Sequence, residues 1–325
     1  MKGQRSDPAP ERGRTGDPSP KSVAVGKAPD AQLPITREPW ESVLQRITAE
    51  LRQARLKLQA AARVSPPGVI GALDRIEVRL ARPLRVAIIG EFNSGKSSLA
   101  NLLIRIEGLP TAVVSSTQIP TLLYHSAKAR VFVVHQDGRR KEVRNAGSIP
   151  APSITRLEVG LPSPCLGGME ILDLPGLADP RFDRGIGEPM LQTADVLVWC
   201  TVSTQAWKES ERTAWQMLPA RLRRWALLVV THSDLVRDAQ DAHKLLRRLS
   251  IEAGEFRDIL LVSTTNALAV LQGERDDQDI ASWLATGADG LDAALNQLLE
   301  TVAARRIKVA LAMTHRIARR ALSSL

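Results

Sequence analysis

Apolar residues along this chain recur with two different periods, and the period changes near residue 84. In two early runs, at 40–58 and 70–80, apolar side chains recur at the three- and four-residue spacing of amphipathic helices. The sequence SPPG at 65–68 interrupts the pattern between them. The spacing therefore predicts a pair of helices within residues 36–82.

Beyond this change, short apolar runs with the length of buried strands alternate with helical patterns. Several runs are apolar on both faces, as strands covered by helices on both sides must be. A QDG turn at 136–138 indicates one antiparallel hairpin. We therefore predict an α/β domain with a mostly parallel sheet over 83–290. The candidate strands are RVAIIG (85–90), ARVFVVH (129–135), MEILDLPG (169–176), ADVLVWCT (194–201), RWALLVVTHSD (224–234) and DILLVS (258–263).

The two ends of the chain differ from this domain. Residues 1–35 are rich in Pro, Gly, Ser and charged residues, which predicts a disordered tail. The segment 291–325 is predicted to be a basic amphipathic helix, and it has no acidic residue from Thr301 onward. Its apolar stripe matches that of the run at 40–58, which favours a small bundle of flanking helices; contact of its arginines with an anionic membrane can coexist with that packing. The basic residues that helical spacing places on one face are Arg305, Arg306, Lys308, Arg316, Arg319 and Arg320.

Composition narrows the possible partners and the compartment. The formal net charge of +9 permits an anionic partner, either a membrane surface or nucleic acid. The six tryptophans are not interleaved with basic residues, as a platform for stacking bases would require, so nucleic acid is not expected. Two cysteines cannot build a disulfide framework. No apolar run has the length of a membrane span and the N-terminus lacks the apolar stretch of a secretory signal, so we expect a cytoplasmic protein.

The stretch GEFNSGKS at 90–97 fits the phosphate-binding pattern G-x-x-x-x-G-K-S, with a predicted strand before it and a helix after it. Its glycines let the backbone turn so that successive N–H groups face phosphate oxygens. Lys96 is expected to reach the β- and γ-phosphates, and Ser97 is expected to bind Mg²⁺. The pattern predicts a nucleoside-triphosphate site. Its residues in this loop are Glu91, Phe92, Asn93, Ser94, Gly95, Lys96, Ser97 and Ser98.

Two further elements would complete the metal and γ-phosphate contacts. ILDLPG (171–176) places Asp173 at a strand end, where its carboxylate can hold the metal through water, and the Gly176 N–H beside the γ-phosphate. Between the two motifs lies the hydroxyl-rich stretch LPTAVVSSTQIPT (109–121). We choose Thr117 as the switch residue that closes over Mg²⁺ and γ-phosphate. The alternatives are Thr111, Ser116 and Thr121.

The base is expected to be guanine. VVTHSD (229–234) ends a strand with Thr231 and Asp234 in T-x-x-D spacing. A carboxylate at Asp234 can accept two hydrogen bonds from N1–H and the exocyclic amine of guanine, and adenine offers no such pair of donors. His232 would flank the base, and the backbone of Ser263 in LLVSTTNA would contact the guanine O6.

Taken in this order, the motifs resemble the P-loop GTPases of the translation-factor-like and Ras-like class, and more closely the dynamin superfamily and its bacterial dynamin-like members. The resemblance covers about 84–265 and is carried by GEFNSGKSSLANLLI, the hydroxyl-rich switch, LEVGLPSPCLGGMEILDLPGL and TADVLVWCTVSTQAWKESE. It implies Mg²⁺-dependent hydrolysis of GTP to GDP and phosphate, with Lys96, Thr117 and Gly176 in catalysis and with Ser97, Thr117 and Asp173 at the metal.

The resemblance also implies partners. Such G domains pair face to face across their nucleotides, so a homodimer or heterodimer is expected. The family's long helical stalk would not fit into the residues after Ser263, which suggests a longer dynamin-like partner. An anionic membrane surface, at the inner face of the cytoplasmic membrane, is the expected place of action.

Two departures from the family pattern weaken the expectation of fast turnover. The guanine motif has His232 where the family usually has lysine. Phe92 occupies the place where eukaryotic dynamins carry a glutamine that orients the attacking water. We therefore expect slow basal hydrolysis, unless a dimer partner completes the site. The alternative function is a regulatory module that binds GTP with little hydrolysis of its own.

Overall fold

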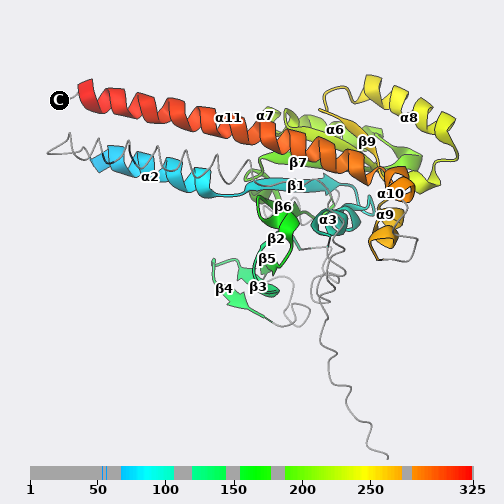
Figure 1. Ribbon diagram of the computed structural model, residues 1–325, viewed down its shortest axis with the longest axis horizontal. Helices are drawn as coiled ribbons and strands as arrows, with labels where there is room; N and C mark the ends of the chain where they lie inside the picture. The colour runs from blue at the N-terminus through cyan, green and yellow to red at the C-terminus, as the bar shows by residue number, and fades with distance from the viewer. Residues whose placement is uncertain are drawn as a thin grey trace, which may run out of the picture.

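A single sheet dominates the part of the chain that the computed structural model describes, namely residues 53, 56, 67–105, 119–143, 154–176, 187–272 and 280–323 (Figure 1). In this part the sheet has nine strands in the order β4-β3-β5-β2-β6-β1-β7-β8-β9. The strands are β1 (Leu84–Gly90), β2 (Thr121–His125), β3 (Arg130–His135), β4 (Arg140–Glu142), β5 (Ile154–Leu161), β6 (Met169–Asp173), β7 (Val196–Val202), β8 (Ala226–Thr231) and β9 (Ile259–Leu261).

The predicted α/β fold with a mostly parallel sheet is confirmed. Strands β6, β1, β7, β8 and β9 pair in parallel with one another in that order, and β2 pairs in parallel with β5. Strand β3 runs antiparallel to β4, which forms the hairpin at the QDG turn. Two antiparallel pairs were not predicted, β3 with β5 and β2 with β6. The sequence reading missed strands β2, β4 and β5.

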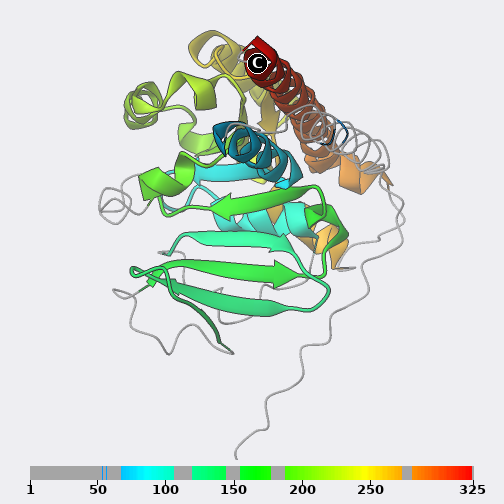
Figure 2. The same cartoon turned by 90° about the vertical axis from the view of Figure 1, so that its left-hand side faces the viewer.

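Helices cover both faces of the sheet (Figure 2), and β1 contributes alternate residues to each side. Val86 and Ile88 belong to a buried cluster with α3 (Lys96–Ile104), α9 (Thr264–Leu271) and the long helix α11 (Ala288–Ser323). Ala87 and Ile89 belong to a second cluster on the opposite face, with α6 (Glu209–Met217), α7 (Ala220–Arg223) and α8 (Ala239–Glu252). Two shorter helices are α5 (Gly187–Leu191) and α10 (Ile280–Ala285).

Three tryptophan rings meet on the second face. The rings of Trp199, Trp207 and Trp215 contact one another edge to face, with centroids 5.6–6.0 Å apart, and Phe256 stacks on Trp215. Beside them lies the buried carboxylate of Glu211, which accepts a hydrogen bond of 3.1 Å from the Trp199 indole N–H. Burial raises the pKa of this carboxyl. We refer to these three rings as the tryptophan cluster.

The long helix α11 has two parts with different surroundings. Its first turns belong to the core of the sheet through Leu291, Leu295 and Leu298. The helix begins at Ala288, three residues before the predicted start at 291. Its second half runs antiparallel beside α2 (Pro67–Ala81), as Figure 1 shows. There a small apolar cluster joins Ile76 and Leu80 of α2 to Ala310. The run at 40–58, expected to be the partner of this stripe, lies outside the described residues except for 53 and 56.

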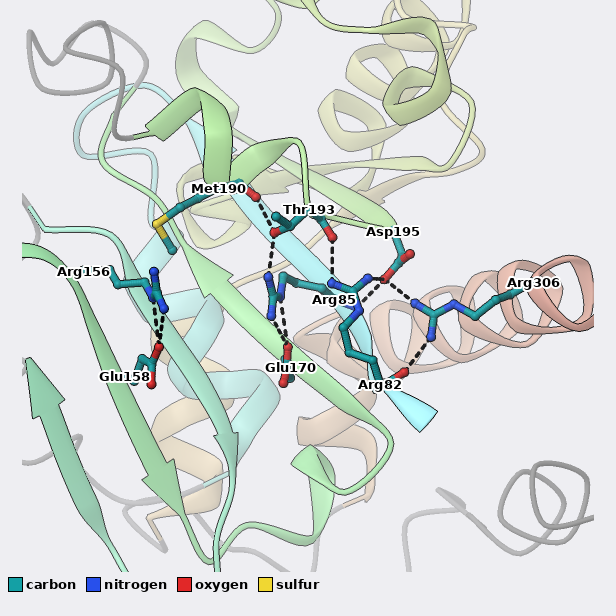
Figure 3. A network of polar contacts seen from close by, with 9 residues as sticks. All are labelled: Arg82, Arg85, Arg156, Glu158, Glu170, Met190, Thr193, Asp195 and Arg306. Atoms are coloured by element: carbon teal, nitrogen blue, oxygen red, sulfur yellow. Dashed lines mark hydrogen bonds and ion pairs between the residues drawn. The ribbon is translucent and has the colours of Figure 1, made fainter. Parts of the chain in front are cut away.

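One carboxylate holds the start of β7 to both flanking helices (Figure 3). Asp195 Oδ2 accepts hydrogen bonds from the Arg82 guanidinium at 2.7 Å, from the Arg306 guanidinium at 2.8 Å and from the Arg85 N–H at 3.0 Å. Arg306 also donates to the Arg82 carbonyl at 2.6 Å. The sequence placed Arg306 on one basic face with Arg305 and Lys308, but its side chain does not share their exposure. Its side chain is only 11% exposed because it reaches back to Asp195.

Candidate nucleotide-binding site

The phosphate-binding loop leaves β1 at Gly90 and enters α3 at Lys96. Gly90 has a φ of +150°, and a Cβ there would lie 2.2 Å from the Cys200 carbonyl oxygen of β7. Gly95 precedes α3 with a φ of +78°. A side chain would strain the backbone at both positions, and at Gly90 it would also collide with the neighbouring strand. The two glycines of the motif are thus required by the way the loop packs on the sheet.

The loop presents a cation and an uncapped helix end to the same place. Within the part of the chain that the structure describes, no side chain caps the start of α3, so the N–H groups of its first turn remain available to an anion. Lys96 is buried, and its ammonium group donates a 2.6 Å hydrogen bond to the Glu91 carbonyl. Burial lowers the pKa of Lys96. A phosphate group would add negative charge beside this buried ammonium, to that of Asp173 and Glu91.

The two predicted metal-binding side chains that the structure describes lie in contact. Ser97 Oγ donates a 2.8 Å hydrogen bond to Asp173 Oδ2, which brings α3 to the end of β6. The other oxygen, Asp173 Oδ1, is buried and has no hydrogen-bond partner in the described structure. Burial raises the pKa of this carboxyl to about 6. A hydroxyl beside an unpartnered carboxylate oxygen suits a hard divalent cation such as Mg²⁺, which takes few protein ligands and completes its shell with phosphates and water.

The glycine of the second motif lies against the loop. A Cβ on Gly176 would lie 2.9 Å from the Phe92 backbone nitrogen and 3.3 Å from the Glu91 carbonyl carbon. Only a residue without a side chain allows this approach. The described backbone therefore brings Gly176 to the phosphate-binding loop, as a contact with a γ-phosphate requires.

The threonine of the T-x-x-D motif contacts the loop. Thr231 is fully buried, and its hydroxyl lies 2.9 Å from the Ser94 carbonyl and 3.1 Å from the Thr201 carbonyl. Both distances are those of a hydrogen bond, for which the hydroxyl has one hydrogen. Thr231 thus fastens the phosphate-binding loop to β8 and β7, a role that the sequence reading did not assign to it.

The other guanine-site residues come together at the ends of β8 and β9. Asp234 is exposed, and its Oδ1 accepts a 2.7 Å hydrogen bond from Ser263 Oγ. His232 has a φ of +54°, and its carbonyl accepts a 2.7 Å hydrogen bond from Ser203 Oγ. Asp234 and Ser263 are therefore neighbours, although 28 residues lie between them in the chain.

The Glu91 side chain makes contacts that the sequence did not suggest. Its carboxylate accepts a 2.6 Å hydrogen bond from Ser210 Oγ and pairs with the Lys208 ammonium at 2.5 Å. Burial tends to raise the pKa of Glu91, but the bonds from Lys208 and Ser210 outweigh it and lower the pKa. The Lys208 N–H bonds in turn to Glu211, beside the tryptophan cluster. The phosphate-binding loop is thus linked to the start of α6.

The remaining predicted residues are placed as follows. The Phe92 side chain is 68% exposed at the tip of the loop, where Asn93 is also exposed. Ser98 is exposed in the first turn of α3. Thr117, with its alternatives Thr111 and Ser116, lies outside the described residues, whereas Thr121 is buried at the start of β2 and donates to the Ile119 carbonyl.

The described residues hold no group of three or more histidine, cysteine, aspartate or glutamate side chains that could bind a metal ion. None of the helices among them is long and apolar enough to cross a membrane.

Known proteins resemble parts of this chain. The profile of the dynamin family matches residues 86–232. Isoniazid-induced protein IniC of Mycobacterium tuberculosis is 38% identical over 120 residues, which cover 34% of this chain and 24% of IniC. Dynamin-like protein 2 of Campylobacter jejuni is 27% identical over 210 residues, which cover 60% of this chain and 33% of that protein.

A solved structure shares the fold over more of the chain. A protein from an oligomerised bacterial dynamin pair, described as a mechanism for long-range sensing and tethering of membranes, matches with a TM-score of 0.62 and 18% identity. The match covers 87% of this chain and 46% of that one. The chain therefore spans less than half the length of each of these similar proteins.

Proposed function

Because the chain belongs to the dynamin superfamily and carries its GTPase domain, we propose that it binds GTP together with Mg²⁺ and hydrolyses it to GDP and phosphate. One observation carries the proposal. The Ser97 hydroxyl and the Asp173 carboxylate meet beside a helix end that, among the described residues, is uncapped, and one buried carboxylate oxygen has no described partner. This arrangement is incomplete without a cation and a phosphate.

Different residues of the site are assigned to the metal ion, the phosphates and the guanine base. The ion would be held by Ser97 and Asp173, and it would neutralise charge on the β- and γ-phosphates. Lys96 and the first N–H groups of α3 bind the phosphate oxygens, and the Gly176 N–H is assigned to the γ-phosphate. Asp234 accepts hydrogen bonds from the guanine edge, with Ser263 fixing the rotamer of its carboxylate.

We expect basal turnover to be slow. Orienting the attacking water requires a polar group, and the loop offers the exposed apolar ring of Phe92 at that position. Thr117 is proposed as the switch residue over the metal. Pairing of two G domains across their nucleotides, as a homodimer or with a longer dynamin-like partner, would complete the site. We place this cycle in the cytoplasm, at the inner face of the cytoplasmic membrane.

The preference for guanine gives the sharpest test of binding. In the full chain with Mg²⁺, Asp234→Asn should weaken GTP binding at least tenfold, because one acceptor oxygen becomes an N–H donor. The same change should improve binding of xanthosine triphosphate, whose C2 carbonyl accepts from the new donor. Asp137→Asn, an exposed aspartate in the β3–β4 turn, serves as the matched control and should bind like wild type. Equal affinities of wild type for ATP and GTP would contradict the proposal.

The exposed Phe92 also supports the alternative, a regulatory module that binds GTP without appreciable turnover. Single-turnover and steady-state hydrolysis at increasing protein concentration separate the two. Turnover that rises with concentration and is abolished by Lys96→Ala supports the GTPase. Tight GTP binding without turnover at every concentration, with or without anionic vesicles, supports the module.

A further inference from the structure

Among the described residues, three arginines without carboxylate partners surround one tryptophan at the end of β8 opposite the proposed nucleotide site. Trp225 immediately precedes β8, whose opposite end carries Thr231 and the guanine motif. The guanidinium carbons of Arg224, Arg257 and Arg305 lie 5.4, 4.8 and 5.8 Å from the centroid of its ring. The three arginines come from the end of α7, the turn before β9 and the middle of α11. The fold thus brings three positive charges to one aromatic ring.

Nearby acidic groups do not neutralise this charge. Glu255 pairs with Arg223 and also accepts from the Trp215 indole N–H, and Asp258 accepts the N–H of Ile259. Asp195 is already shared by the Arg82 and Arg306 guanidinium groups. Within the described residues, therefore, the three arginines around Trp225 have no carboxylate partner.

Their donors are also largely free. Among the described residues, the guanidinium groups of Arg224 and Arg305 make no hydrogen bond, and Arg257 uses only its Nε, toward the Arg224 carbonyl at 2.9 Å. All three arginine residues are exposed, whereas Trp225 is half-buried. Planar guanidinium groups that are held in place by an aromatic ring and retain free N–H donors match the oxygens of a phosphate group.

The exposed side of α11 continues this surface. Arg305, Lys308, Arg316 and Arg319 recur at helical spacing and are all exposed. Between them lie Val309 and Met313, each 46% exposed. A surface of this kind, with basic residues around half-exposed apolar ones and a tryptophan at one end, is suited to the headgroup region of a bilayer.

We propose that the Trp225 cluster and the exposed stripe of α11 form a binding surface for anionic phospholipids, with the three arginines around Trp225 holding lipid phosphates. The inference rests on the proposed location of the protein at a membrane and names the surface that would contact the lipids. It does not depend on whether the protein hydrolyses GTP. Two features favour a bilayer over a nucleic acid. The surface interleaves apolar side chains with its charges, and the described part of it offers one aromatic ring, not a series on which bases could stack.

The test is sedimentation of the full chain, without nucleotide, with vesicles made of equal parts phosphatidylglycerol and phosphatidylcholine. Arg224→Gln/Arg305→Gln should weaken vesicle binding by roughly 30-fold, because each basic residue near an anionic surface contributes about a fivefold factor. Neither guanidinium makes a hydrogen bond within the described structure, so the fold should survive. Lys128→Gln/Arg247→Gln removes two exposed charges from the β2–β3 turn and from α8, and it should bind vesicles like wild type.

A second pair, Arg316→Gln/Arg319→Gln, tests the stripe without touching the ring and should weaken vesicle binding to a similar extent. The inference is overturned if either double variant binds vesicles as tightly as the wild-type chain does. It is also overturned by equal binding to pure phosphatidylcholine, competition by inorganic phosphate alone, or tighter binding of single-stranded RNA than of vesicles at the same salt concentration. GTP hydrolysis is measured separately in solution without vesicles. If the wild-type chain binds vesicles but does not hydrolyse GTP, only the proposed GTPase activity is refuted. If it hydrolyses GTP but does not bind vesicles, only the lipid surface is refuted.

Discussion

The hydroxyl of Thr231 links the guanine-motif strand to the phosphate-binding loop, and its removal should weaken GTP binding. Thr231→Val keeps the shape of the side chain and removes its single hydrogen-bond donor. The Ser94 carbonyl in the loop and the Thr201 carbonyl of β7 then lose the hydroxyl that lies 2.9 and 3.1 Å from them. Because Thr231 is fully buried, water cannot replace that donor without a rearrangement.

The expected magnitude follows from one unsatisfied buried acceptor. Such a group costs about 1–3 kcal/mol, and the two carbonyls share one hydrogen, so the free energy of unfolding should fall by one such amount. The Ser94 carbonyl belongs to the loop that must be ordered around the phosphates. If the loop is released locally, GTP binding has to restore its order, and the affinity should fall roughly tenfold.

The assay pairs urea unfolding with titration of a fluorescent GTP analogue. Thr231→Ser is the control, because it keeps the donor and removes the methyl group that packs against Gly95. Deletion of that methyl should cost about 1 kcal/mol of stability and leave the affinity for GTP close to wild type. If Thr231→Val binds GTP as tightly as Thr231→Ser, the hydroxyl does not order the loop and the reasoning fails.

Three other positions give predictions of the same kind. Gly176→Ala puts a Cβ 2.9 Å from the Phe92 nitrogen, so the analogue titration should show at least tenfold weaker GTP binding with an unchanged circular dichroism spectrum; unchanged affinity would show that the two segments separate easily. Asp195→Ala leaves the guanidinium of Arg306 buried without its carboxylate and should lower the free energy of unfolding by about 3 kcal/mol in urea; a loss below about 1 kcal/mol would show that the pair is dispensable. Burial raises the pKa of the Glu211 carboxyl above its ordinary value of 4.5. The protonated carboxyl therefore contributes its full share of the free energy of unfolding below pH 4.5, and this share is lost as the pH rises through the raised pKa. Urea unfolding of Glu211→Gln across this range should lack that decline, and parallel profiles for variant and wild type would contradict the assignment.

The parts of the fold that were predictable are those whose signal is local. A strand buried on both faces, such as β1, β7 or β8, appears as an uninterrupted apolar run. The edge strand β4 could not be recognised, because all of its residues are exposed. In β5, Arg156 and Glu158 pair on one face and break the apolar run. The alternation of polar and apolar residues in β5 indicates a strand only when one face of that strand is already known to be polar.

The same limit applies to the site. The phosphate-binding loop is continuous in sequence, so its glycines and Lys96 could be assigned from a pattern. The contact between Glu91 and Ser210 joins residues 119 positions apart, and the one between Arg306 and Asp195 joins residues 111 positions apart. Helical spacing alone put Arg306 on one basic face with Arg305 and Lys308, because spacing defines a face of a helix but not what packs against it.

The tryptophan cluster gives this protein a built-in optical probe. Half of its six tryptophans lie in that one cluster, where the Trp199 indole bonds to Glu211. Glu211 accepts the N–H of Lys208, whose ammonium holds Glu91 in the phosphate-binding loop. Three polar contacts therefore connect the loop to the Trp199 indole, so a rearrangement of the loop should change the environment of that ring. The tryptophan fluorescence of the unlabelled chain should then report whether a nucleotide occupies the loop.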